Sequence, residues 1–399
     1  MGTAVPPSDA PRTEAVHAGR HDFSDRGVHA PPIDLSTTYP FGSLDDAARS
    51  LQSLAGGGDD AEEPIYARLH NPTVARCEDA VARLEGADQC VAFGSGMAAV
   101  TATMLAARMD GRHIVAVRPC YGTTDHLLTS GLLGLDVTWT RPQNIGKACG
   151  DDTSLILVET PSNPTLALID LDDVVGQAGD VPVLVDSTFA PPVLQQPLRH
   201  GATLSLHSAT KFLGGHGDVV GGVVSTTDSE WARRLRQVRV MTGALLHPMA
   251  AYLLHRSLPT LPGRVAQAQA SAQTLAARLA EHEAVSSVSY PGLRDNPLLG
   301  TQMKGPGTMI SFDVGDTEAA RRILDTVDLI TPAVSLGAVD SLIQHPASLT
   351  HGVVEEDTLQ DSGVTPGLLR LSVGLEDEAD LWEDLTTALN ASLPEVASH

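Results

Sequence analysis

The chain contains only three lysines, and one of them stands in a setting suited to covalent chemistry. Lys211 follows an apolar run and precedes a glycine-rich stretch, whereas Lys147 and Lys304 lie in polar, glycine-containing segments typical of a surface. An amine that attacks an aldehyde needs a lowered pKa, a partly desolvated seat and room for a planar partner. Ser208 and Thr210 precede Lys211 and carry hydroxyls that can bond phosphate oxygens. A structural turn is the alternative for this motif taken alone.

A second candidate is the turn Gly94-Ser95-Gly96-Met97, which ends a short apolar strand and opens an Ala-rich helix. Glycines at such a junction let backbone N–H groups and the helix dipole face an anion. Gly96 and Met97 are therefore candidates for holding a phosphate through their backbone. A plain tight turn explains the same residues. Because the pattern is not GxGxxG, a dinucleotide site has little support.

A third candidate is Asp186, which follows the apolar run Val181-Pro-Val-Leu-Val185. The run predicts a buried strand that carries the carboxylate to its end, where α/β folds place ligands. A buried carboxylate is costly unless it is paired. The N–H of a protonated pyridine ring is such a partner, and the pair would keep that ring an electron sink. The alternative is that Asp186 caps the next helix.

The elements that must position these residues follow from the spacing of apolar side chains. Asn71-Pro72 begins an amphipathic helix that Gly86 ends. Short apolar strands are predicted at residues 90–93, 113–117, 155–159, 181–185 and 203–207. Helical or turn segments separate these strands, which predicts a mostly parallel, buried sheet flanked by helices.

Beyond a hinge expected at residues 259–263, the pattern predicts a smaller α+β domain. Its expected elements are a helix at 265–282, a strand at 308–314, a helix at 317–327, a strand at 368–373 and a helix at 376–389. We therefore predict an α/β protein of three parts. These are an N-terminal arm at 1–65, without periodicity, a cofactor-binding domain at 66–262 and a C-terminal domain at 263–399.

Composition narrows the class of protein. The net charge of −23 argues against a nucleic-acid partner, because phosphate backbones bind basic surfaces. No apolar run approaches the roughly 18 residues that cross a bilayer, and the first residues lack a signal-peptide pattern. The four cysteines have neither CxxC pairing nor metal-ligand spacing. We expect reduced thiols in a cytoplasmic protein, no membrane partner and no metal site.

Several motifs together resemble the cysteine/methionine-metabolism (trans-sulfuration) family of pyridoxal 5′-phosphate (PLP) enzymes. In chain order they are Tyr66-Ala67-Arg68, Asn71-Pro72-Thr73, Ser95-Gly96-Met97, Tyr121-Gly122, Glu159-Thr-Pro-Ser-Asn163-Pro164, Asp186-Ser187-Thr188 and Ser208-Ala-Thr-Lys211. The resemblance covers residues 13–389. It implies a fold-type I PLP-dependent enzyme that acts on a small amino acid, assembled as a homotetramer of two tight dimers.

The resemblance also implies a role for each motif. Lys211 would bond to the cofactor aldehyde, Asp186 would meet the ring nitrogen and Tyr121 would stack on the ring. The residues implied in holding the phosphate and the ring oxygen are Gly96, Met97, Ser208, Thr210 and Asn163, joined by Tyr66 and Arg68 of a neighbouring subunit. The active site would then be shared across the dimer.

For the substrate, the resemblance implies elimination at the γ-carbon. Arg370, helped by Ser335, would clamp the substrate carboxylate with its planar fork. Lys211 would move the α-proton, and Tyr121 is a candidate general acid for the departing thiol. The expected products are 2-oxobutyrate, ammonia and a thiol.

Residues 331–337 and 344–351 look most like the members that cleave methionine. Cystathionine-handling relatives generally carry Glu at the position of Val334, where a carboxylate suits a distal ammonium and Val suits a methyl thioether. Thr123 stands where methionine γ-lyases typically have Cys, and Arg239-Val240 where they tend to have Lys-Asp. Cystathionine γ-lyase and a γ-replacement enzyme (cystathionine γ-synthase or homoserine sulfhydrylase) stay open. A protein that binds PLP without turnover would need neither the carboxylate-binding Arg370 nor the acid Tyr121. The presence of both residues argues against that alternative.

Overall fold

Two β-sheets organise the computed structural model, which describes residues 10–59, 64–352 and 363–393. Parts of the expected arm (1–9 and 60–63) and of the expected C-terminal domain (353–362 and 394–399) lie outside the described residues. The larger sheet has seven strands in the order β1-β7-β6-β5-β4-β2-β3. These strands are β1 Gln89–Phe93, β2 His113–Val117, β3 Asp136–Thr140, β4 Thr153–Glu159, β5 Val183–Asp186, β6 Leu204–His207 and β7 Gly222–Thr226.

The larger sheet is mostly parallel, as predicted. Strands β3, β2, β4, β5 and β6 run parallel, and β7 is antiparallel to both of its neighbours, β6 and β1. The sequence pattern missed β3 and β7. β3 is a partly exposed edge strand with Asp, Thr and Trp among its five residues, and β7 begins at a glycine, so neither shows a long apolar run.

Helices cover both faces of this sheet. They are α4 Pro72–Glu85, α5 Gly96–Ala107, α6 Gly122–Thr129, α7 Ile145–Ala148, α8 Leu171–Ala178, α9 Ser229–Thr242 and α10 Pro248–Ser257. Leu184 and Leu206 pack with α5 and α9 on one face, whereas Val183 and Val185 pack with α7 and α8 on the other. Successive strand residues point to opposite faces of the sheet. Since helices cover both faces, the side chains on both sides are buried, and these short strands appear in the sequence as continuous apolar runs.

Helix α4 forms as its sequence predicts. The Asn71 side chain accepts hydrogen bonds from the backbone N–H of Thr73 (3.0 Å) and of Val74 (3.2 Å). Pro72 occupies the first turn, where its missing N–H leaves no hydrogen bond unmade. Gly86 ends the helix at φ 69°, in the left-handed region that favours glycine.

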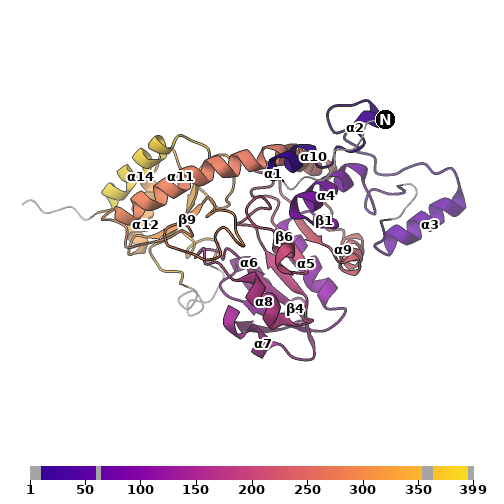
Figure 1. Ribbon diagram of the computed structural model, residues 1–399, viewed down its shortest axis with the longest axis horizontal. Helices are drawn as coiled ribbons and strands as arrows, with labels where there is room; N and C mark the ends of the chain where they lie inside the picture. The colour runs from indigo at the N-terminus through magenta and orange to yellow at the C-terminus, as the bar shows by residue number, and fades with distance from the viewer. Residues whose placement is uncertain (1–9, 60–63, 353–362, 394–399) are drawn as a thin grey trace, which may run out of the picture.

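The smaller sheet has the order β10-β11-β12-β9-β8. Its strands are β8 Ser287–Ser289, β9 Met309–Asp313, β10 Thr331–Pro332, β11 Leu342–Gln344 and β12 Leu368–Ser372, and its helices are α11 Leu261–Glu281, α12 Thr317–Thr326 and α14 Glu378–Ser392. Figure 1 shows α11 running from the larger sheet toward α12 and α14. The expected hinge at 259–263 is a helical turn, Leu258–Thr260, that continues directly into α11.

The expected arm contains helices that the sequence analysis missed: α1 Pro11–His17, α2 Phe23–Arg26 and α3 Leu44–Ala55. The first two are shorter than the window in which periodicity is visible. Ala15 and Ala18 are buried in the same cluster as residues of α4 and α10, so this part of the chain belongs to the core. Helix α3 lies at the right-hand end of Figure 1, set apart from the two sheets.

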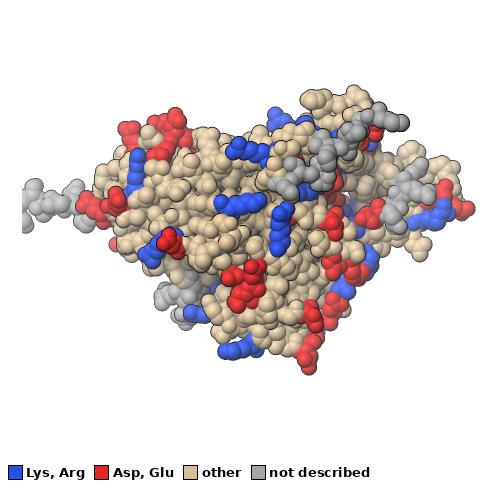
Figure 2. All heavy atoms as spheres, in the orientation of Figure 1, with Lys and Arg blue, Asp and Glu red and all other residues tan. Residues whose placement is uncertain are grey.

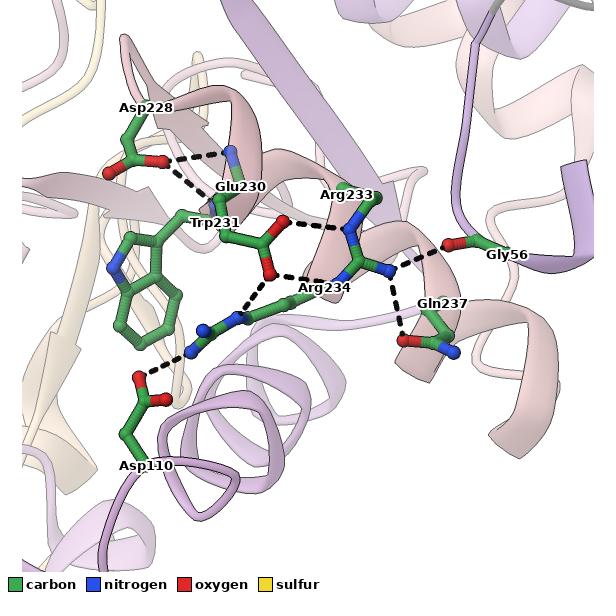
Figure 3. A network of polar contacts seen from close by, with 8 residues as sticks. All are labelled: Gly56, Asp110, Asp228, Glu230, Trp231, Arg233, Arg234 and Gln237. Carbon is green, nitrogen blue, oxygen red and sulfur yellow. Dashed lines mark hydrogen bonds and ion pairs between the residues drawn. The ribbon is translucent and has the colours of Figure 1, made fainter. Parts of the chain in front are cut away.

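A polar network fastens the end of α3 to α9, as Figure 3 shows. Arg233 donates a hydrogen bond to the carbonyl of Gly56 at 3.0 Å. Glu230 accepts hydrogen bonds from Arg233 and Arg234, and these two guanidiniums lower its pKa to about 2. Arg234 also pairs with Asp110. Exposed ion pairs contribute about 0–1 kcal/mol each, so the network orients α3 more than it stabilises the fold.

The acidic side chains do not form one block on the face shown in Figure 2, where groups of Asp and Glu alternate with Lys and Arg. Within the described part of the chain, no helix has the length and apolar character needed to span a membrane.

Candidate active site

A cavity of about 510 Å³, called the principal cavity below, lies at the carboxyl ends of the central parallel strands. Glu159 ends β4, Asp186 ends β5 and Ser208 follows β6, and all three line this cavity. Parallel strands end at a common sheet edge, which is where open α/β sheets bind ligands. The loop that carries Val334 and Ser335, next to the smaller sheet, lines the cavity as well.

Lys211 enters this cavity, and its Nζ donates a hydrogen bond to Ser335 Oγ at 2.6 Å. Burial, assisted by the nearby charge of Arg370, lowers the pKa of Lys211 to about 8. A lysine with that pKa has far more neutral amine at neutral pH than an ordinary lysine, as nucleophilic attack requires.

The glycine-rich stretch after Lys211 is held by α11. Arg264 donates a hydrogen bond to the carbonyl of Phe212 at 3.0 Å. Gly215 has φ 68°, and a Cβ there would lie 2.0 Å from the Arg264 guanidinium. This left-handed φ favours glycine, and a side chain here would displace the Arg264 guanidinium that holds the loop.

The amino end of α5 forms another wall of the cavity. Ser95 caps the helix by accepting a hydrogen bond from Ala98 N–H at 3.0 Å. A Cβ on Gly96 would lie 2.9 Å from Ser208 Cβ, so the glycine lets the helix end approach the β6 loop closely. The Thr210 hydroxyl donates a hydrogen bond to the carbonyl of Gly221 (3.2 Å). Of the two hydroxyls, that of Ser208 is therefore the more available to donate to an anion. This end of the cavity suits an anion.

Asp186 faces the cavity beside a second carboxyl group. Its Oδ1 accepts hydrogen bonds from the N–H (3.0 Å) and the hydroxyl (2.5 Å) of Thr188. Burial raises the pKa of Asp186, and the bonds from Thr188 oppose that rise. Glu159 is its register partner on β4, and burial and the Asp186 charge raise its pKa well above the usual value. A cation between the two groups would keep them ionised.

The alternative role for Asp186, capping a following helix, does not hold. The residues after it, 187–190, form turns and no helix, and its bonds to Thr188 close a local turn.

Arg370 lies in β12 and is only 2% exposed. Its Nη1 donates to Asn163 Oδ1 (2.8 Å) and its Nη2 donates to the carbonyl of Ser335 (3.0 Å). Burial lowers the pKa of Arg370 to about 10, so it stays charged at neutral pH. Ser335 has φ 93°, a conformation that costs a residue with a side chain about 1–3 kcal/mol and is found at functional sites. Val334 beside it lines the cavity with its side chain 52% exposed.

Tyr66 and Arg68 do not line this cavity. They border a separate one of about 470 Å³, where Arg68 Nη1 donates to the carbonyl of Val240 at 2.9 Å and its guanidinium lies 5.5 Å from the Tyr66 ring. Tyr66 is 41% exposed. All the other cofactor and substrate residues expected from the sequence meet in the principal cavity.

Some lining residues were missed as site residues. Glu159, Thr188 and Phe189 end or follow strands at the ligand-binding edge, and that position is the signal that identifies them. Leu349 and Thr350 belong to the segment 344–351 that resembles the methionine-cleaving members, and close packing against α6 brings this segment to the cavity. A Cβ on Gly122 would lie 2.3 Å from the Thr350 carbonyl.

The groups around this cavity match the parts of PLP one by one. A lysine of low pKa suits the aldehyde, the amino end of α5 suits the phosphate, and the buried Asp186 suits the ring nitrogen. Together with the mostly parallel sheet, the site defines a fold-type I PLP-dependent enzyme. Comparison with known proteins agrees: the model of the Cys/Met metabolism PLP-dependent enzyme family matches residues 12–390. The chain belongs to this family.

Relatives within the family include both lyases and synthases. An L-methionine gamma-lyase of Brevibacterium sandarakinum is 55% identical over 389 residues, covering 96% of this chain and 98% of that protein. A cystathionine gamma-lyase of Bacillus subtilis (strain 168) is 42% identical, covering 95% and 98%. The crystal structure of cystathionine gamma synthase from Xanthomonas oryzae pv. oryzae, in complex with aminoacrylate and cysteine, superposes with a TM-score of 0.88 at 34% identity, covering 97% and 99%.

Proposed function

We propose that the chain is a carbon–sulfur lyase that converts L-methionine and water into 2-oxobutyrate, ammonia and methanethiol. The observation that carries this proposal is the apolar wall beside the carboxylate clamp, formed by Val334, Leu336 and Leu349. A methyl thioether is neutral, and contact with such a wall favours it over a side chain that ends in a second ammonium and carboxylate. The 55% identical relative named L-methionine gamma-lyase supports the same substrate.

Four residues of the cavity then have a task. Arg370 binds the substrate carboxylate and so fixes the α-carbon near Lys211. The neutral Lys211 amine takes the α-proton and then a β-proton of the substrate, and the Tyr121 hydroxyl gives a proton to the leaving thiolate. Water then replaces the amino group, which departs as ammonia. Asp186 holds the ring nitrogen protonated. PLP, when bound, supplies the electron sink that stabilises negative charge on the substrate carbons.

The second candidate is cystathionine γ-lyase. Thr123 and Thr350 line the cavity, and a threonine hydroxyl there can bond the distal polar groups of cystathionine. The 42% identical relative from Bacillus subtilis carries that name.

One assay separates the candidates. The purified enzyme is given methionine, cystathionine, cysteine and O-acetylhomoserine side by side, and keto acid and thiol are measured. We expect the highest kcat/KM with methionine, with 2-oxobutyrate and methanethiol formed in equal amounts. Keto acid from cystathionine at a much higher kcat/KM supports the second candidate. Consumption of O-acetylhomoserine only when a thiol is added indicates a replacement enzyme.

We further propose that two copies share each active site through Tyr66 and Arg68, within a homotetramer. Leu35 (58% exposed) and Tyr66 (41% exposed) line the same cavity as Arg68, and these exposed apolar groups support a surface that a second copy covers. The cytoplasmic location and the trans-sulfuration pathway stay predictions.

A further inference from the structure

We propose that Glu159 is a positioning residue that fixes the tyrosine on one side of the active site relative to the carboxylate-binding arginine on the other. This inference rests on the roles proposed above for Tyr121 and Arg370. Glu159 ends β4 and opens the motif Glu159-Thr-Pro-Ser-Asn163-Pro164, but neither the motif nor its position gives the residue a role.

The Glu159 carboxyl group bridges two segments that are separate in the fold. Its Oε2 accepts a hydrogen bond from the backbone N–H of Tyr121 (2.8 Å), immediately before α6. Its Oε1 accepts one from the backbone N–H of Asn163 (2.7 Å), in the loop after β4. Each oxygen thus holds a different wall of the cavity. The side chain itself is buried, with the residue 5% exposed, and belongs to a strand in the middle of the sheet.

The bridge continues to the carboxylate clamp and to the lysine. Asn163, whose N–H bonds Glu159, accepts a hydrogen bond from Arg370 through its own side chain (2.8 Å). Arg370 donates to the carbonyl of Ser335 (3.0 Å), and the Ser335 hydroxyl accepts from Lys211 (2.6 Å). An unbroken series of hydrogen bonds therefore joins Tyr121 to Lys211, and Glu159 is the member that makes two bonds to backbone.

Charge supports the same role. Arg370 is buried, and among the described residues no carboxylate forms an ion pair with it. Burial lowers the pKa of Arg370, and a negative charge on Glu159 acts in the opposite direction. The two side chains are linked through Asn163. Glu159 thus acts on the guanidinium through Asn163, whose backbone N–H it holds and whose side chain accepts from Arg370.

The test is Glu159→Gln in the PLP-loaded enzyme. The amide keeps the shape but offers one acceptor, and its NH₂ group faces a backbone N–H, so one of the two bonds is lost. We expect the variant to retain PLP, because Lys211 and Asp186 are unchanged. We expect KM for methionine to rise and kcat to fall, each by about tenfold or more, because both walls are displaced.

A second readout is independent of the reaction. Glycine has the carboxylate and amine of a substrate but no side chain, and its binding is followed by the change in cofactor absorption. We expect Glu159→Gln to weaken glycine binding by about tenfold, as a displaced Arg370 requires. Because glycine is not turned over, this result stands even if methionine is not the substrate of the wild type.

The matched control is Asp313→Asn. Asp313 is also a buried strand-end carboxylate that accepts hydrogen bonds, from Gly315 (2.7 Å) and Ser286 (3.0 Å), but it belongs to the smaller sheet and does not line the cavity. We expect this control to lower Tm without changing glycine affinity.

If Glu159→Gln lowers Tm and leaves KM, kcat and glycine affinity at wild-type values, as in the control, the positioning role is wrong. Should Glu159→Gln fail to fold, Glu159→Asp replaces it. The shorter side chain keeps the charge but cannot span both N–H groups, so glycine binding should still weaken. Wild-type glycine affinity in Glu159→Asp would overturn the proposal.

Discussion

The Lys211 amine lies 2.6 Å from the Ser335 hydroxyl, although 124 residues separate the two in the chain. Lys211 follows the last parallel strand of the larger sheet, and Ser335 lies between two strands of the smaller one. The Ser335 backbone carbonyl also accepts a hydrogen bond from Arg370. A single strained residue thus contacts the Lys211 amine through its side chain and the Arg370 guanidinium through its backbone, so the two sheets must pack correctly for the site to form.

The pKa of about 8 predicts how the apoenzyme takes up its cofactor. Only the neutral amine attacks the aldehyde, and the neutral fraction of Lys211 rises as pH increases through about 8. We expect the rate of PLP incorporation to rise with pH and to level off above about 8, rather than near the ordinary lysine value of about 10.4. Absorption of the yellow product measures the rate, and borohydride reduction with peptide mapping should place the pyridoxyl group on Lys211.

Label on Lys147 or Lys304 would contradict the site. A matched variant is Arg370→Met, which removes the charge that assists burial in lowering the Lys211 pKa, so the midpoint should move to higher pH.

Replacement of Asp186 by Asn tests the ring contact. The amide keeps the shape but removes the charge that would hold the ring nitrogen protonated. The loss of one partner of a buried charged pair costs ~3–5 kcal/mol, so turnover should fall by orders of magnitude. Steady-state kinetics of the PLP-loaded variant measure it. A rate near that of the wild type would mean that another group protonates the ring.

Substrate choice is tested by Val334→Glu. An apolar wall favours a methyl thioether by ~1.5–3 kcal/mol when a Val-sized side chain is fully buried, and the half-exposed Val334 should contribute less. We expect kcat/KM for methionine to fall and the ratio of cystathionine to methionine turnover to rise. Val334→Leu, which keeps the wall apolar, is the control. If Val334→Glu leaves the ratio unchanged, Val334 does not set the specificity, whereas the lyase assignment is unaffected.

The sharing of sites between copies is tested by subunit mixing. Arg68→Ala should weaken PLP retention even though Lys211 is intact, because Arg68 would reach a neighbour's phosphate. Inactive Arg68→Ala and Lys211→Ala protomers should recover part of the activity when mixed, since one hybrid site carries both intact groups. Mixing either variant with itself is the control. An absence of recovery after verified subunit exchange would argue against a shared site.

The sequence by itself determined the elements and groups whose signals are local. Asn71, Pro72 and Gly86 delimit α4 because capping depends on neighbours within one turn. The apolar runs predicted the central strands, and they place Asp186 and Lys211 at one edge of the sheet, because parallel strands end together. Knowledge of the family motifs added Arg370 and Ser335, which no local pattern marks.

Only the tertiary structure decided how these groups meet. Arg370 bonds Asn163 across 207 residues, Glu159 joins α6 to the loop after β4, and Tyr66 with Arg68 borders a different cavity. Contacts of this kind depend on the order of strands and on the packing of the two sheets. Residue spacing along the chain reports hydrogen bonds within a turn or a strand, and it carries no information on which distant backbone N–H a buried carboxylate will reach.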